Sequence, residues 1–140
     1  VMGFSTGAYV SFAIAAKRND IAAYVGRALL TSFDDLLSIL KKNDPERQFL
    51  PPENYPAELL PINAARKIKI PVFLAVGEKD NRTPCWMSEK IMTELKGPKE
   101  LWSVPNAEHG GMNGPEFITY PEFFDRVNAF FGRVLGVSSR

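Results

Sequence analysis

The sequence predicts an α/β fold with a mostly parallel sheet, in a single domain that spans residues 1–140. Two observations lead to this prediction. Short apolar runs typical of buried strands alternate along the whole chain with segments whose apolar residues recur at helical spacing. The composition is that of an ordinary globular domain, because apolar residues make up 45% of the chain and charged residues 24%. The alternation predicts about three parallel strands flanked by helices.

The first elements expected along the chain are a helix, a strand and a second helix. Residues 6–18 repeat small and apolar side chains at helical spacing and end in two cations, which favour a helix C-terminus. Residues 21–30 form an apolar run of strand length, although Arg27 interrupts it. Residues 31–42 begin with a threonine and a serine, either of which is suited to cap a helix with acidic residues in its first turn.

A proline-rich insert is expected at residues 43–64. Its five prolines exclude one long helix or a central strand. Its aromatic and leucine side chains favour burial, so the segment is not a flexible linker.

The second half of the chain continues the alternation. Residues 70–76 form a compact apolar run typical of a strand, and turn-forming residues follow it. Residues 86–96 predict an amphipathic helix, and residues 100–105 a short strand. The glycine, asparagine and proline content of residues 106–116 indicates a loop. Residues 120–135 repeat apolar side chains in the pattern of a helix packed by one face.

Charge and composition exclude several classes of function. The 17 basic and 16 acidic residues are scattered, so no nucleic-acid interface is expected. No apolar run approaches the ~20 residues that cross a bilayer, so no membrane partner is expected. The single cysteine, Cys85, cannot form an internal disulfide, which favours a reducing compartment such as the cytoplasm. No basic residue flanks Cys85 in the sequence, and we interpret it as a structural residue rather than a reactive thiol.

The chain opens with a G-x-S-x-G pattern at residues 3–7. Glycines at both ends suit a tight turn from a strand into a helix, and Ser5 would then project at the helix N-terminus, where N–H groups favour developing negative charge. A serine hydroxyl is a poor nucleophile unless a base takes its proton. A phosphate-binding loop is disfavoured, because neither G-x-G-x-x-G nor a G-K-[ST] ending is present.

A base and an acid each follow a predicted strand. His109, the only histidine, comes after residues 100–105 in a glycine-containing loop, and Asp80 comes after residues 70–76. Taken singly, each is more typical of a solvated loop. Both, however, fall at carboxyl ends of strands, where α/β sheets place functional groups.

Three blocks of the chain, VMGFSTGAY, KIKIPVFLAVGEKDNRTP and GPKELWSVPNAEHGG, resemble the nucleophile, acid and histidine blocks of the α/β-hydrolase superfamily. The resemblance is greatest to prolyl-oligopeptidase-like and dienelactone-hydrolase-like esterases and peptidases. It implies that Ser5 is the nucleophile, Asp80 the acid and His109 the base, in the superfamily's chain order. It also implies that the Thr6 N–H is one oxyanion-hole donor, and that no metal or organic cofactor is needed.

The same resemblance leaves one alternative for the acid. Some members of the superfamily carry it one strand earlier, where this chain has Asp34 and Asp35. Asp80 is favoured because its flanking block fits better.

The resemblance further implies that the chain is the C-terminal portion of a hydrolase domain. The strands before the turn at Ser5, and the loop that carries the second oxyanion donor, are expected to precede Val1. The segment 21–30 would then be an exposed sheet edge through which the chain associates with itself.

The insert at 43–64 occupies the position from which related enzymes build a lid over the site. Four of its apolar residues are therefore candidate substrate-binding residues: Phe49, Tyr55, Leu59 and Leu60.

These inferences favour a serine hydrolase that cleaves carboxylic esters or peptide bonds through a Ser-His-Asp triad and an acyl-enzyme. Its substrate would be a small ester or a peptide. Two alternatives stay open. One is an acyltransferase with the same triad, and the other is a non-catalytic or truncated module that acts through protein association.

Overall fold

The computed structural model describes residues 1–46 and 48–136, and these contain a four-stranded parallel sheet in the order β1-β2-β3-β4. The strands are β1 (Met2–Phe4), β2 (Tyr24–Arg27), β3 (Val72–Gly77) and β4 (Lys99–Val104). The parallel α/β architecture predicted from the alternation is confirmed. It has one strand more than expected, because Met2–Phe4 pairs with β2.

The helices are α1 (Thr6–Lys17), α2 (Phe33–Asn43), α3 (Pro61–Ala64), α4 (Cys85–Glu94), α5 (Pro115–Ile118) and α6 (Glu122–Leu135), with short 3-10 turns at Ala57–Leu59, Ala65–Lys67 and Gly111–Asn113. The four longer helices, α1, α2, α4 and α6, follow the predicted segments closely, whereas the short helices α3 and α5 were not expected. None of the helices in the described part of the chain has the length and apolar character needed to cross a bilayer.

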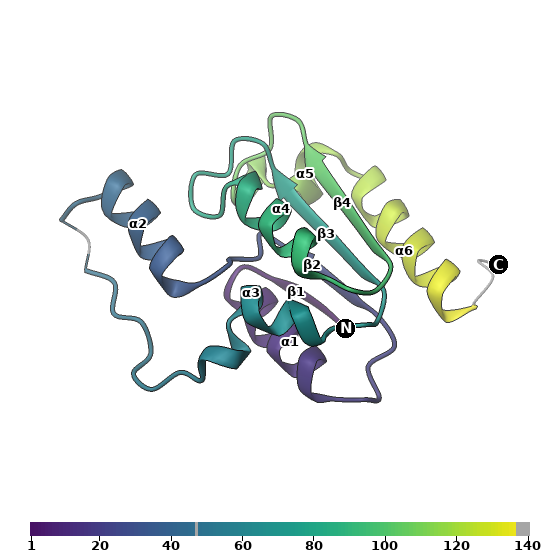
Figure 1. Ribbon diagram of the computed structural model, residues 1–140. Helices are drawn as coiled ribbons and strands as arrows, with labels where there is room; N and C mark the ends of the chain where they lie inside the picture. Colours follow the sequence, from purple (N-terminus) through teal and green to yellow (C-terminus); the bar gives the residue numbers. More distant parts are fainter. Residues whose placement is uncertain (47, 137–140) are drawn as a thin grey trace.

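Helices cover both faces of the sheet (Figure 1), with α1, α3 and α4 on one face and α6 on the other. Side chains that alternate along the strands supply the two cores. Tyr24 and Leu74 point toward α1 and α4, whereas Val25 and Phe73 point toward α6. The sheet is therefore apolar on both faces, as expected of parallel strands. The candidate catalytic residues lie beyond the ends of its strands.

Strand β1, and not the segment 21–30, lies at an edge of the sheet. Strand β2 pairs with β1 on one side, where Gly26 lies opposite Gly3, and with β3 on the other, where Gly26 lies opposite Leu74. The expected exposed edge at 21–30 is therefore wrong. The reason is that the first residues of the chain are sufficient to pair: the Val25 N–H donates to the Val1 carbonyl over 2.9 Å.

Helix α2 and the chain that follows it extend away from the sheet (Figure 1). Ser32, rather than Thr31, caps α2, because its side chain accepts a hydrogen bond from the Asp35 N–H at 3.2 Å. No residue of α2 is fully buried. This helix thus forms a wall beside the body of the domain instead of a part of its core.

The proline-rich segment 43–64 ends in the core. Its last four residues form α3, in which Pro61 and Ala64 are buried, and Ala64 belongs to the core under α1 and α4. The described residues between α2 and α3, 44–46 and 48–60, are irregular apart from the 3-10 turn at 57–59. Within the irregular part, the ring of Tyr55 contacts that of Phe33 in α2.

Candidate active site

Ser5 stands on a strained turn between β1 and α1. Its backbone φ of 50° lies in the left-handed region, which non-glycine residues seldom adopt. The turn is held by the Ser5 N–H, which donates to the Arg27 carbonyl over 2.9 Å. Helix α1 begins at the next residue, Thr6, so Ser5 sits at the N-terminus of a 12-residue helix.

Only the first glycine of the G-x-S-x-G pattern is required by close packing. A Cβ at Gly3 would lie 2.3 Å from the Ser11 Oγ and 2.5 Å from the Gly7 carbonyl oxygen, so α1 crosses directly over β1. A Cβ at Gly7 would meet nothing within 4 Å. Both glycines were expected to suit the tight turn, and the close approach of α1 to β1 requires a glycine at Gly3 alone.

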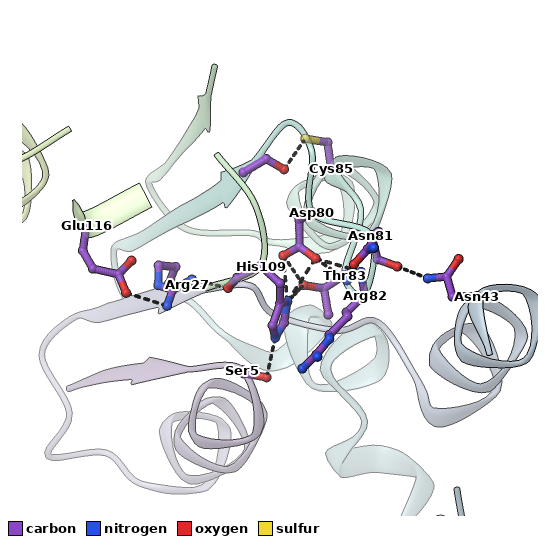
Figure 2. A network of polar contacts seen from close by, with 11 residues as sticks. Ser5, Arg27, Asn43, Asp80, Asn81, Arg82, Thr83, Cys85, His109 and Glu116 are labelled. Atoms are coloured by element: carbon purple, nitrogen blue, oxygen red, sulfur yellow. Dashed lines mark hydrogen bonds and ion pairs between the residues drawn. The ribbon is translucent and has the colours of Figure 1, made fainter. Parts of the chain in front are cut away.

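The structure brings Ser5, His109 and Asp80 together from the ends of three strands (Figure 2). The Ser5 Oγ lies 3.0 Å from the His109 Nε2. The His109 Nδ1 lies 2.9 Å from the Asp80 Oδ2. His109 follows β4 and Asp80 follows β3, at the carboxyl edge of the sheet where Ser5 follows β1.

The buried carboxylate of Asp80 is held by several donors besides His109. The N–H groups of Arg82 and Thr83 donate to Oδ1 over 2.9 Å and 2.8 Å, and the Thr83 hydroxyl donates to Oδ2 over 2.8 Å. Burial by itself raises the pKa of the Asp80 carboxyl, but the hydrogen bonds from His109 and from the Thr83 and Arg82 N–H groups outweigh it and hold the pKa below its ordinary value. Asp80 is therefore an anion at neutral pH.

The charge of Asp80 selects one tautomer of His109. A carboxylate only accepts hydrogen bonds, so Nδ1 carries the proton and donates it to Asp80. Nε2 is then left with a lone pair directed at the Ser5 hydroxyl, 3.0 Å away. Such an arrangement can withdraw the proton of a serine as its oxygen attacks an electrophile.

A cleft of about 360 Å³ opens beside Ser5 and His109. Thr6, Arg82 and Thr83 contribute to its polar end. Its remaining wall is largely apolar and comes from α1, from the residues after β2, from α2 and from the segment after α2: Tyr9, Leu30, Phe33, Leu36, Leu40, Phe49, Leu50 and Pro52. The cleft thus combines polar groups near Ser5 and His109 with a largely apolar wall.

Of the four candidate substrate-binding residues, Phe49 lines this cleft. Tyr55 lies behind it, with its ring 5.2 Å from that of Phe33, and faces a separate groove along α1 together with Leu59. Leu60 is half-buried and does not line the cleft at Ser5. The structure therefore brings one of the four residues to the candidate site.

The alternative residues lie elsewhere. The Asp35 carboxylate accepts a hydrogen bond from the Thr31 hydroxyl and lies 3.5 Å from the Lys90 Nζ, so it is engaged away from His109. Cys85 is half-buried, and its Sγ lies 3.3 Å from the Ser103 Oγ. Among the described residues, Asp80 is the carboxylate placed against His109.

Sequence reasoning missed three residues that surround the site: Thr83, Arg27 and Glu116. Thr83 stands three residues after Asp80, a spacing at which an aspartate commonly bonds the following backbone, so a local signal existed. Arg27 and Glu116 form an ion pair of 2.8 Å between β2 and α5. Their separation of 89 residues leaves no local sequence signal.

One protein family matches the sequence of this chain, and several solved structures match its fold. A sequence model of the prolyl oligopeptidase family matches residues 1–138. No curated protein sequence matches the chain.

Several solved structures are similar over almost the whole chain. A puromycin-hydrolyzing peptidase of Mycobacterium tuberculosis is 19% identical with a TM-score of 0.78, and the match covers 99% of this chain and 22% of that one. An esterase of Pyrococcus furiosus is 22% identical with a TM-score of 0.76, covering 96% of this chain and 53% of that one. An acylaminoacyl peptidase bound to a chloromethyl ketone is 19% identical with a TM-score of 0.75, covering 99% and 24%.

These similarities establish that the chain has an α/β-hydrolase fold. The chain spans between about a fifth and about half of the length of these proteins, from 22% to 53%.

Proposed function

Because the chain belongs to the prolyl oligopeptidase family, we propose that it carries the catalytic residues of a serine hydrolase that cleaves carboxylic esters or peptide bonds. The observation that supports this most directly is the pair of contacts made by His109, at 3.0 Å to Ser5 and at 2.9 Å to Asp80. These three residues have no local reason to meet, since they lie at positions 5, 80 and 109 of the chain.

In the proposed reaction, the Ser5 Oγ attacks the carbonyl carbon of the substrate while its proton passes to the His109 Nε2. A bond forms between Oγ and the carbonyl carbon, and the carbonyl oxygen becomes an oxyanion. Asp80 holds the imidazole in position and stabilises it when it becomes an imidazolium. The imidazolium then protonates the leaving alcohol or amine as the bond to it breaks, which leaves an acyl-enzyme.

A water molecule completes the reaction. His109 takes a proton from this water, which attacks the acyl carbon, and returns the proton to Ser5 as the acid product leaves. The N–H of Thr6 is the proposed donor to the oxyanion in both halves of the reaction. As the first residue of α1, Thr6 has an N–H without a partner in the helix, at the positive end of the helix dipole.

Labelling by a fluorophosphonate probe tests the reaction in the complete gene product. The wild type should be labelled at Ser5, whereas Ser5→Ala and His109→Ala should lose labelling and lower kcat for an ester substrate by about 10⁴-fold or more. Ser103→Ala, which changes an exposed serine on β4, is the matched control and should keep both. A folded wild-type protein that the probe does not label at Ser5 would contradict the proposal.

The cleft supports a preference for substrates with an apolar group next to the scissile carbonyl. Its volume of about 360 Å³ and its apolar wall suit an aliphatic or aromatic side chain or a medium-length acyl chain. Part of the segment 43–64 would act as a lid, because Phe49, Leu50 and Pro52 of this segment line the same cleft as Ser5.

The variant Phe49→Ala tests this preference with nitrophenyl esters of increasing acyl length. It should raise KM for the longer acyl chains by about 10-fold, from the loss of roughly 1–3 kcal/mol of apolar contact, and leave acetate esters nearly unchanged. Phe124→Ala, on the exposed side of α6, is the control. An equal change for all acyl lengths would exclude Phe49 from the substrate-binding wall.

A further inference from the structure

Arg27 is a charged residue in a place that excludes water. It is the last residue of β2, and only 3% of its surface is exposed. A buried guanidinium is costly unless its N–H groups and its charge find partners. The contacts of the Arg27 guanidinium therefore indicate the role of this residue.

Each part of the guanidinium contacts a different segment around the site. The Nη1 donates to the carbonyl oxygen of His109 over 2.6 Å, and the Nη2 donates to the Glu116 Oε1 over 2.8 Å (Figure 2). The Cζ lies 3.3 Å from the ring centroid of Phe4, within the range of a cation–π contact. Phe4 is the residue immediately before Ser5.

One side chain therefore joins the segment of the proposed nucleophile to the segment of the proposed base. The Phe4 ring in turn lies 5.6 Å from the imidazole ring of His109, so the two segments also touch directly. The backbone of Arg27 adds a further link, because its carbonyl accepts the hydrogen bond from the Ser5 N–H. On the far side, Glu116 on α5 neutralises the charge and fixes the direction of the guanidinium.

We propose that Arg27 is a positioning residue that sets the place of the His109 imidazole relative to the Ser5 hydroxyl, through the His109 carbonyl and the Phe4 ring. This inference rests on the proposed function for its catalytic consequence, although the positioning itself is a property of the fold. Arginine suits the role because its planar fork donates in two fixed directions and stacks on an aromatic ring. Lysine, a point charge on a flexible stem, cannot make the three contacts at once.

The double variant Arg27→Met/Glu116→Gln tests the proposal in the complete gene product. It keeps most of the side-chain volume and leaves no lone buried charge, which protects the fold. The matched control is Arg133→Met/Glu100→Gln, which removes an exposed ion pair of 2.6 Å between α6 and β4. The variant Arg27→Lys tests whether charge alone is sufficient.

Amide hydrogen exchange measures the positioning without any reference to catalysis. In the double variant, the amides of residues 106–114 should exchange about 10-fold faster, while those of β3 keep the wild-type rate, because the loop loses its anchor and the sheet does not. Unchanged exchange in 106–114 would overturn the proposal. An equal increase in β3 would also overturn it, because the role of Arg27 would then be general stability.

Kinetics with an ester substrate measure the consequence. The double variant should lower kcat by about 10- to 100-fold, since a misplaced base slows proton transfer, with KM within about 2-fold of the wild type. Arg27→Lys should recover only part of this loss. A double variant with wild-type kcat, in a protein whose wild type is active, would overturn the proposal.

The two proposals fail in different ways. If the wild type is not labelled at Ser5, the proposed function fails, and the exchange rates of residues 106–114 still decide whether Arg27 positions His109. If the wild type is labelled and active, and the double variant matches it in exchange or in kcat, the inference about Arg27 fails alone.

Discussion

At the scale of single residues, the charge of Asp80 depends on donors that belong to its own turn. Its side chain is fully buried, yet Arg82 and Thr83, two and three residues further on, supply N–H and hydroxyl donors to both carboxylate oxygens. The same turn thus compensates the cost of burying an anion and directs that anion at His109.

The dependence of stability on pH follows from the lowered pKa of Asp80. The hydrogen bonds of Asp80 favour its charged form, so they stabilise the folded state at pH values above the ordinary pKa of 3.8. This stabilisation is lost as the pH falls below 3.8 and passes through the lower pKa that Asp80 has in the folded protein. Asp80→Asn should lower the free energy of unfolding by about 1–3 kcal/mol at pH 7. Chemical denaturation as a function of pH measures the difference, which should shrink in acid. A difference independent of pH would contradict this assignment of charge.

Candidate site residues were predictable from the sequence where a reactive residue type also stands at the position in the chain that the superfamily's order requires. Asp80 and His109 each follow a recognisable strand, Ser5 stands in a G-x-S-x-G pattern, and the order of the three residues in the chain supports the prediction. Arg27 was not predictable, because in the sequence it only interrupts an apolar run. Its partner Glu116 lies 89 residues away, and no local pattern in the sequence indicates that these two charged side chains pair in the folded protein.

At the scale of elements, the turn from β1 into α1 depends on one close approach. A Cβ at Gly3 would lie 2.7 Å from the Ala8 Cα and closer still to the Ser11 Oγ, so helix and strand would have to separate. The backbone atoms at this crossing have little room to move. The packing at Gly3 therefore supports the strained conformation of Ser5 next to it.

Gly3→Ala should destabilise the protein by about 2 kcal/mol or more, as overpacked cores do, and should slow fluorophosphonate labelling as Ser5 shifts. Gly7→Ala is the matched substitution within the same pattern. It meets open space and lies in the first turn of α1, so its effect should be neutral or stabilising by up to about 1 kcal/mol. Thermal unfolding compares the two, and equal destabilisation would contradict the packing argument.

The long elements were predictable from consecutive residues, α1 and α6 from apolar side chains at helical spacing and β3 from a compact apolar run. The short ones were not. The segment 106–116, expected to be a loop, contains the 3-10 turn at 111–113 and the start of α5. Its shape depends on contacts such as that of the Glu108 N–H with the Asn113 carbonyl, at 2.8 Å. Such hydrogen bonds within a loop depend on the surrounding tertiary structure, and no periodic pattern in the sequence indicates them.

At the scale of the whole molecule, the edge at β1 is apolar. Val1, Met2 and Phe4 are 42%, 45% and 42% exposed. A strand edge with exposed apolar side chains and unpaired N–H and carbonyl groups readily pairs with another chain. The chain of residues 1–140 should therefore self-associate through β1.

Sedimentation velocity of the 140-residue chain measures this association. Met2→Lys should shift the chain toward monomer, because a charge on an edge strand opposes pairing. Leu135→Lys adds the same charge at an exposed position on α6 and should leave the association unchanged. Equal effects of the two substitutions would place the contact elsewhere.

The order of the strands fixes how far the loop that bears His109 has to reach. Ser5 follows β1 and His109 follows β4, and β2 and β3 separate these two strands. At about 4.8 Å between neighbours, the gap is roughly 14 Å, which at ~3.3 Å per extended residue takes at least four or five residues to bridge. The chain provides five, from Val104 to His109. Shortening this connection by even one or two residues would therefore place the imidazole over the middle of the sheet, too far from Ser5 for contact.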